Sequence, residues 1–185
     1  MILVIAERVH SPSMPAAKVA EWAELWRKAP MRCMHIVKAM THGSTRKRLE
    51  HLLCSPPNRV MNLLPPDSRC GSWNAAQARD VAQQFRKWLY EGRDPEITSE
   101  CGQHGEVKTL VLCGSRVMDA WFSGAPPQKF LEIGRSWRYR GISHMFMPHP
   151  SGRNRVWNDP ENVLKMREGA MRVHLGVCDL EEIGA

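Results

Sequence analysis

Four short apolar runs, each followed by a stretch with helical periodicity, constrain the fold of this chain more than any other feature. The runs lie at residues 2–6, 59–64, 107–113 and 142–147. Apolar side chains recur three and four residues apart in the segments between them, as on helices that bury one face. The predicted helices are Ala16–Lys28, Gly43–Leu53, Asn74–Tyr90, Gly114–Phe122 and one that starts near Asn158-Asp159-Pro160.

Strands that alternate with helices pair in parallel through right-handed crossovers, so helices cover both faces of the sheet. We therefore expect an α/β fold, a three-layer α/β/α sandwich with a central, mainly parallel four-stranded sheet. At 185 residues the chain is long enough for one self-sufficient core. We expect a single domain over 1–174 and a loosely packed C-terminal tail over 175–185.

The composition is that of a soluble globular protein, with 43% hydrophobic and 24% charged residues. The first apolar run is too short to cross a membrane and lacks the basic flank and cleavage site of a signal peptide. These features predict a monomer without a membrane partner in the cytoplasm, either bacterial or phage-encoded.

The cysteines are widely spaced and form neither a C-x-x-C pair nor a zinc-ligand pattern. They are Cys33, Cys54, Cys70, Cys101, Cys113 and Cys178. Free thiols in a reducing compartment are the simplest interpretation, and we expect no metal and no cofactor.

The net charge of +7 is concentrated in three clusters, 46–48, 135–140 and 153–155. Trp137, Tyr139 and Trp157 lie within or next to two of these clusters, a combination suited to phosphate contacts with stacking nearby. Charge alone is equally consistent with ordinary solvated faces, so a nucleic-acid partner needs support from other residues.

Common catalytic and nucleotide-binding motifs are absent from the sequence. It contains no G-x-x-x-x-G-K-[ST], which argues against a P-loop enzyme, and no G-x-G-x-x-G after the first strand, which argues against a dinucleotide fold. H-E-x-x-H and G-x-S-x-G are missing too. Gly105 and Gly114 stand alone at strand boundaries, where a structural role is the stronger interpretation.

Polar residues lie at the ends of three of the predicted strands: Glu7 after the first, Asn62 within or just after the second, and His149 after the fourth. The last strand stops abruptly in His149-Pro150-Ser151-Gly152. The carboxyl ends of parallel strands share one edge of the sheet, so these side chains are expected to converge on one cleft. Each also has an ordinary interpretation, as a surface ion pair, a turn residue or a cap.

The order of these segments resembles the uracil-DNA glycosylase superfamily over roughly residues 2–160. The matching pieces are Ile5–Glu7, Val60–Pro66, Leu110–Phe122 and Pro148–Asn154, the last of which carries the His-Pro-Ser signature. The resemblance implies a DNA glycosylase that hydrolyses the N-glycosidic bond of uracil or a modified pyrimidine flipped out of single- or double-stranded DNA.

The resemblance also implies roles for individual residues. Glu7 would position the attacking water and His149 would stabilise the departing base, while Asn62 would read the pyrimidine edge. His42 and Trp73 are candidates for contact with the base. The expected DNA-binding residues are Ser151, Gly152, Arg153, Asn154 and Arg155, with Arg153 as the wedge that fills the vacated space.

The first motif departs from the family pattern. Relatives have small residues and a proline around the glutamate, whereas this chain has Ala6-Glu7-Arg8-Val9, which predicts a reshaped pocket or a lost water site. The paired cysteines of the iron–sulfur branch do not precede the first strand, so we expect no cluster. Two alternatives stay open: a catalytically inactive DNA-binding protein with the glycosylase fold, and an enzyme acting on a free nucleotide or nucleoside.

Overall fold

The structure is a computed structural model whose central feature is a five-stranded sheet with the strand order β2-β1-β3-β5-β4. It describes residues 2–7, 17, 20–21, 24, 43–57, 59–64, 73–91, 107–150 and 154–180. The strands are β1 (Ile2–Ala6), β2 (Arg59–Asn62), β3 (Thr109–Cys113), β4 (Ser136–Tyr139) and β5 (Ile142–Met147). The first four in spatial order pair in parallel, and β4 pairs antiparallel with β5. The predicted α/β class and mainly parallel sheet are thus confirmed.

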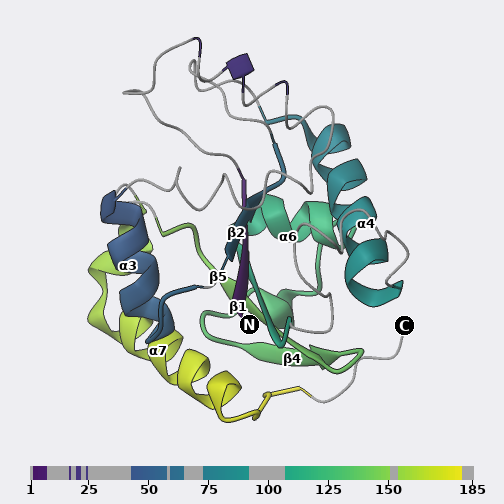
Figure 1. Ribbon diagram of the computed structural model, residues 1–185. Helices are drawn as coiled ribbons and strands as arrows, with labels where there is room; N and C mark the ends of the chain where they lie inside the picture. Colours follow the sequence, from purple (N-terminus) through teal and green to yellow (C-terminus); the bar gives the residue numbers. More distant parts are fainter. Residues whose placement is uncertain are drawn as a thin grey trace.

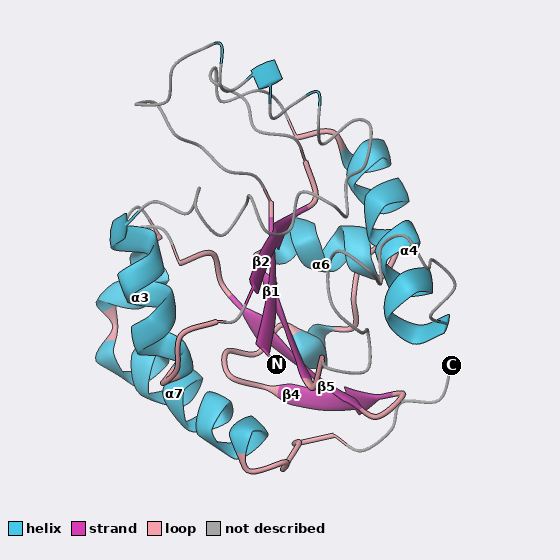
Figure 2. Ribbon diagram, in the orientation of Figure 1, coloured by secondary structure: helices cyan, strands magenta, loops and turns pink. Residues whose placement is uncertain are grey.

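Helices cover the sheet on both faces. They are α3 (Gly43–Leu53), α4 (Ala75–Glu91), α6 (Ser115–Trp121) and α7 (Pro160–His174), with short 3₁₀ turns at Gln128–Phe130 and Arg155–Asn158. Figures 1 and 2 show α4 and α6 on one side of the sheet and α3 and α7 on the other. Of the helix expected over Ala16–Lys28, only residues 17, 20, 21 and 24 are described, and all four are helical.

Two apolar cores lie on the two faces, and strand side chains alternate between them. Leu3 and Ile5 pack into the core under α4 and α6, while Val4 between them packs into the core under α3 and α7. This period of two is what a strand covered on both sides requires. Among the described elements, none is a helix both long and apolar enough to span a bilayer.

Side-chain caps start two helices where the sequence predicts them. The Asn74 Oδ1 accepts a hydrogen bond from the Gln77 N–H at 3.1 Å, and the Asp159 Oδ1 accepts one from the Glu161 N–H at 2.9 Å. Each cap satisfies a backbone donor that the first helical turn leaves free. Pro160, at the first position of α7, has no N–H to lose.

The prediction of four strands is wrong, because the basic cluster at 135–140, outside the four predicted runs, contains β4. Ser136–Tyr139 pairs with β5 through a tight turn at Arg140 and Gly141, both with positive φ (48° and 74°). Two successive positive φ values match the backbone twist of a two-residue hairpin. Trp137, expected near phosphates, is instead 2% exposed in the core.

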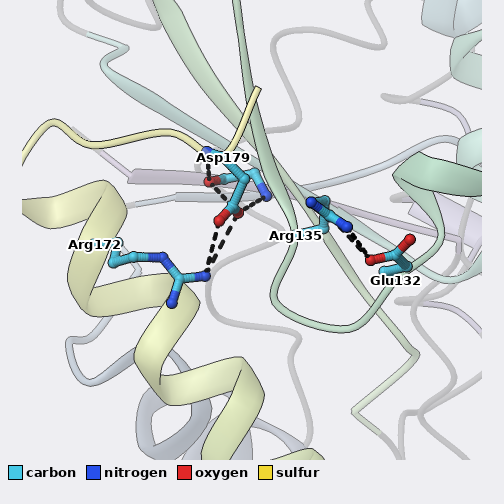
Figure 3. Close-up of polar contacts among 5 residues, drawn as sticks. Glu132, Arg135, Arg172 and Asp179 are labelled. Carbon is cyan, nitrogen blue, oxygen red and sulfur yellow. Dashed lines mark hydrogen bonds and ion pairs between the residues drawn. The ribbon is translucent and has the colours of Figure 1, made fainter. Parts of the chain in front are cut away.

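The chain beyond α7 is exposed at Leu175 and Val177, as a loosely packed tail would be, but it is tied to β4 at Asp179 and Leu180. Asp179 accepts hydrogen bonds from the N–H and Oγ of Ser136 (2.8 and 3.0 Å) and pairs with Arg172 at 3.2 Å (Figure 3). Leu180 continues the pairing: its N–H donates to the Ser136 carbonyl, and its carbonyl accepts from the Arg138 N–H. Residues 181–185 lie outside the described residues.

Candidate active site

The carboxyl ends of four parallel strands form one edge of the sheet, and a polar residue or glycine stands at each end. Asn62 ends β2, Glu7 follows β1, Gly114 follows β3, and His149 lies two residues beyond β5. The sheet order places these four strands next to one another. These four strand ends therefore share one edge of the sheet, as their parallel order requires.

Glu7 is held by backbone pairing that continues past the end of β1. Ala6 is in register with Asn62, and its carbonyl accepts a hydrogen bond from the Leu63 N–H at 3.0 Å. The Glu7 carbonyl accepts one from the Leu64 N–H, also at 3.0 Å. The main chain at Glu7 is thus fixed even though the residue lies outside the strand, which limits where its carboxylate can lie.

Glu7 and His149 both lie next to Gly114. A Cβ on Gly114 would lie 3.2 Å from the Glu7 Oε1 and 3.8 Å from the His149 Cβ. Its backbone (φ 96°, ψ 152°) occupies a region open essentially to glycine alone. The Gly114 N–H donates to the Met147 carbonyl at 2.8 Å, which joins the ends of β3 and β5.

A hydrogen-bonded turn supports His149. Its carbonyl accepts from the Asn154 Nδ2 and from the Trp157 Nε1, each at 3.0 Å. The Asn154 Oδ1 in turn accepts from the Val156 N–H at 3.2 Å. Both ends of the Asn154 amide therefore stabilise the turn, a structural role that the expected DNA contact did not include.

The titration of His149 reflects both its burial and its neighbour. Burial lowers the pKa of the imidazole below its usual range, and the charge of Glu7 partly opposes that shift. The net direction favours neutral imidazole near neutral pH, a form with one N–H donor and one acceptor nitrogen. Burial raises the pKa of the Cys113 thiol, and the Glu7 carboxylate raises it further, so Cys113 is not a thiolate nucleophile.

Arg116 belongs to this edge, and sequence reasoning missed it. Its Nη1 lies 3.6 Å from the Glu7 Oε2, and its guanidinium lies 5.9 Å from the centre of the Trp73 ring. The Arg116 side chain is 58% exposed and that of Glu7 26%. The sequence signal was Gly114-Ser115-Arg116 at a strand end, where a structural role for Gly114 was the stronger interpretation.

Asn62 is 5% exposed at the end of β2. Because Val60 faces α3 and α7, Asn62, two residues later, lies on the same face. Adjacent strands are about 4.8 Å apart, so three spacings put the backbones of β2 and β5 about 14 Å apart.

Several predicted site residues lie outside the described residues: His42, Ser151, Gly152 and Arg153. Arg155 is described and exposed in the 3₁₀ turn before α7. Trp157 is 7% exposed and packs in a core, so it does not offer the stacking surface that its basic neighbours suggested.

Among the described residues, no three His, Cys, Asp or Glu side chains are grouped so as to hold a metal ion. A comparison of the sequence with protein-family models found no match, and a comparison with curated proteins found no significant match.

Proposed function

We propose that this protein is a DNA glycosylase that hydrolyses the N-glycosidic bond of uracil or a modified pyrimidine flipped out of DNA. The observation that carries the proposal is the approach of the Glu7 carboxylate and His149 to Gly114 at the carboxyl edge of a parallel sheet. A carboxylate beside a neutral imidazole offers the two functions that this hydrolysis needs, a group that holds water and a hydrogen-bond donor.

The reaction breaks the bond between C1′ of the sugar and the ring nitrogen of the base, and the electron pair leaves with the base. Water adds its oxygen to C1′, and the proton it gives up balances the negative charge of the departing base, so the products are a neutral free base and an abasic site. Glu7 would orient that water and stabilise the positive sugar. Neutral His149 would donate its N–H to the base carbonyl as negative charge develops there, a contact that typically contributes about 3 kcal/mol to transition-state stabilisation.

Asn62 would select the base. An amide presents a donor and an acceptor side by side, as the Watson–Crick edge of a pyrimidine does. Its near-complete burial at the end of β2 makes an unmatched base costly, because polar groups would then be left unpaired.

The test is base release from a panel of oligonucleotides that carry uracil, hydroxymethyluracil and other modified pyrimidines. We expect alkali-labile abasic sites with at least one of them, and identification of the released base by mass. His149→Ala and Asn62→Asp should each lower the rate at least about 100-fold. His51→Ala, at an exposed histidine of α3, is the matched control and should retain the rate. Absence of base release across the whole panel would overturn the proposal.

A catalytically inactive DNA-binding protein is the second candidate, and the Arg116–Glu7 ion pair favours it. A guanidinium on the carboxylate competes with water for the same oxygens. If the ion pair prevents the Glu7 carboxylate from binding water, the Arg116→Gln variant should release base from DNA, whereas the unaltered protein should not. Salt-dependent DNA binding without base release, in both Arg116→Gln and the unaltered protein, would instead support the binding role.

A further inference from the structure

A cavity of about 950 Å³ lies at the opposite edge of the sheet, where the parallel strands begin. Its walls come from the starts of β1, β3 and β5, the β4–β5 turn and the last residues of α4 and α7. This edge lies near the point marked N in Figure 1. Glu7 and His149 follow the other ends of β1 and β5. The cavity therefore does not belong to the candidate active site.

Three cations line this cavity: Lys108, Arg138 and Arg140. No aspartate or glutamate is among the described residues that line it, although Glu91 directly follows the lining residue Tyr90. The exposed His174 and the hydroxyl residues Ser55, Thr109 and Ser143 add further polar groups. The lining is suited to a ligand with several negatively charged oxygens.

None of the three cations has a carboxylate partner among the described residues. Arg116, Arg135, Lys165 and Arg172 each pair with a glutamate or aspartate. Lys108, Arg138 and Arg140 form no ion pair with any described residue. Their charge is thus not neutralised within the described part of the chain, and it is gathered around one hollow.

Two of these side chains are already held in place. The Arg138 Nη2 donates to the Gly176 carbonyl at 2.6 Å, while its buried Nε has no hydrogen-bond partner in the described part of the chain. The Arg140 guanidinium lies 5.7 Å from the Tyr90 ring and 5.5 Å from the Tyr139 ring. Held side chains lose less conformational freedom when a ligand arrives.

The helix ends at this edge act against an anion, because α4 and α7 both present their carbonyl ends here. Arg138 already bonds one of the carbonyls beyond α7, which leaves Lys108 and Arg140 to supply most of the attraction. A volume of about 950 Å³ is far larger than one inorganic phosphate needs and falls in the range of sites for nucleotide-sized molecules.

We propose that this cavity binds a phosphate-bearing ligand of nucleotide size, with Lys108 and Arg140 as the principal contacts. The shared chemistry is a phosphate beside an organic group that can pack against Tyr90. Such a phosphate can come from a free nucleotide or from the end of a nucleic-acid strand. The proposal does not depend on glycosylase activity at the other edge.

The test is isothermal titration calorimetry of the full chain at moderate salt with pyrophosphate, a deoxynucleoside triphosphate, and a short oligonucleotide with and without a 5′-phosphate. We expect at least one phosphate probe to bind. Lys108→Gln and Arg140→Gln should each weaken that binding about tenfold, the effect of losing one charge-assisted hydrogen bond. Thermal unfolding of each variant checks that the fold is retained.

Lys129→Gln is the matched control, because Lys129 is exposed, does not line the cavity and carries the same charge. Equal weakening by Lys108→Gln and Lys129→Gln would show that only net charge matters and would overturn the proposal. Failure of every probe to bind would overturn it too. Binding of the 5′-phosphorylated oligonucleotide alone would support the site and identify a strand end as the source, whereas binding of the triphosphate would identify a free nucleotide.

Discussion

Gly114 is the residue on which the candidate active site depends most. Alanine there would meet the Glu7 Oε1 at 3.2 Å and would adopt a backbone conformation that costs about 1–3 kcal/mol. We expect Gly114→Ala to lower the free energy of unfolding in urea by at least that amount. Under the glycosylase proposal it should also lower base release, because the clash displaces the carboxylate.

Gly141→Ala provides the comparison, since Gly141 also has a positive φ (74°) but nothing within 4 Å of an added Cβ. This variant isolates the backbone strain from the contact with Glu7. If Gly141→Ala and Gly114→Ala reduced base release equally, the close approach of Gly114 to Glu7 would have no part in the effect.

The strand-end residues of the site could be predicted from the sequence, but the ion pair between Arg116 and Glu7 could not. Glu7, Asn62 and His149 follow strands whose parallel order dictates a shared edge. The contact between Arg116 and Glu7 depends on how α6 packs on β3, the strand next to β1, and no local pattern encodes that distance. In the sequence, Gly114 is one glycine at the end of a strand. Its role in the site becomes visible only in the structure, where Glu7 and His149 lie next to it.

At the scale of elements, α7 approaches the loop before β4 so closely that two glycines meet. A Cβ on Gly169 would lie 2.1 Å from the Gly134 carbonyl oxygen, and a backbone atom cannot move aside as a flexible side chain can. Helix propensity favours alanine over glycine by about 1 kcal/mol, whereas overpacking costs about 1–3 kcal/mol. Because a contact this short is at the severe end of overpacking, we expect Gly169→Ala to destabilise the protein.

Chemical denaturation compares this variant with Glu168→Ala, at the exposed neighbouring position of α7. Glu168→Ala should change the free energy of unfolding by no more than about 0.5 kcal/mol, as surface substitutions usually do. A stabilising Gly169→Ala would mean that α7 can shift away from Gly134 without loss of packing.

The strand β4 marks the limit of element prediction from this sequence. The longer elements carry a clear period of two or of three to four, whereas Ser136–Tyr139 is four residues long and lies in a basic segment. Its signal was the Arg140-Gly141 pair, a turn whose two positive φ values permit a hairpin. The same hairpin moves Arg138 and Arg140 to the edge away from the candidate active site, so the basic clusters do not form one continuous surface there.

At the scale of the whole molecule, a buried histidine links stability to pH. His144 lies in an aromatic cluster; its Nδ1 donates to the Ile142 carbonyl at 2.9 Å, which leaves Nε2 to accept the Tyr90 O–H at 2.5 Å. Burial lowers its pKa to about 4, the hydrogen bond to Ile142 opposes this shift, and the charge of Arg86 adds to it. The neutral ring is therefore part of the folded state.

Between pH 6.5 and about 4 the unfolded chain binds a proton at this position that the folded chain does not. The contribution of neutral His144 to the free energy of unfolding is thus fully present above the pKa of the unfolded chain, 6.5. It falls as the pH drops towards the pKa of His144 in the folded chain. From pH 7 to pH 5, His144 should account for a loss on the order of 2 kcal/mol in the free energy of unfolding. Urea titrations at several pH values in this range measure it.

His144→Gln removes the titration while it keeps a donor and an acceptor for Ile142 and Tyr90. It should flatten the pH dependence, even if it lowers stability at pH 7. His149→Gln is the necessary comparison, because the pKa of His149 is lowered as well and acts in the same direction. Burial raises the pKa of Asp179, but the hydrogen bonds from Ser136 and the pairing with Arg172 lower it more. The stability that Asp179 contributes is therefore lost only at a lower pH than the one at which His144 titrates. An unchanged slope in His144→Gln would show that acid sensitivity above pH 5 arises elsewhere in the chain.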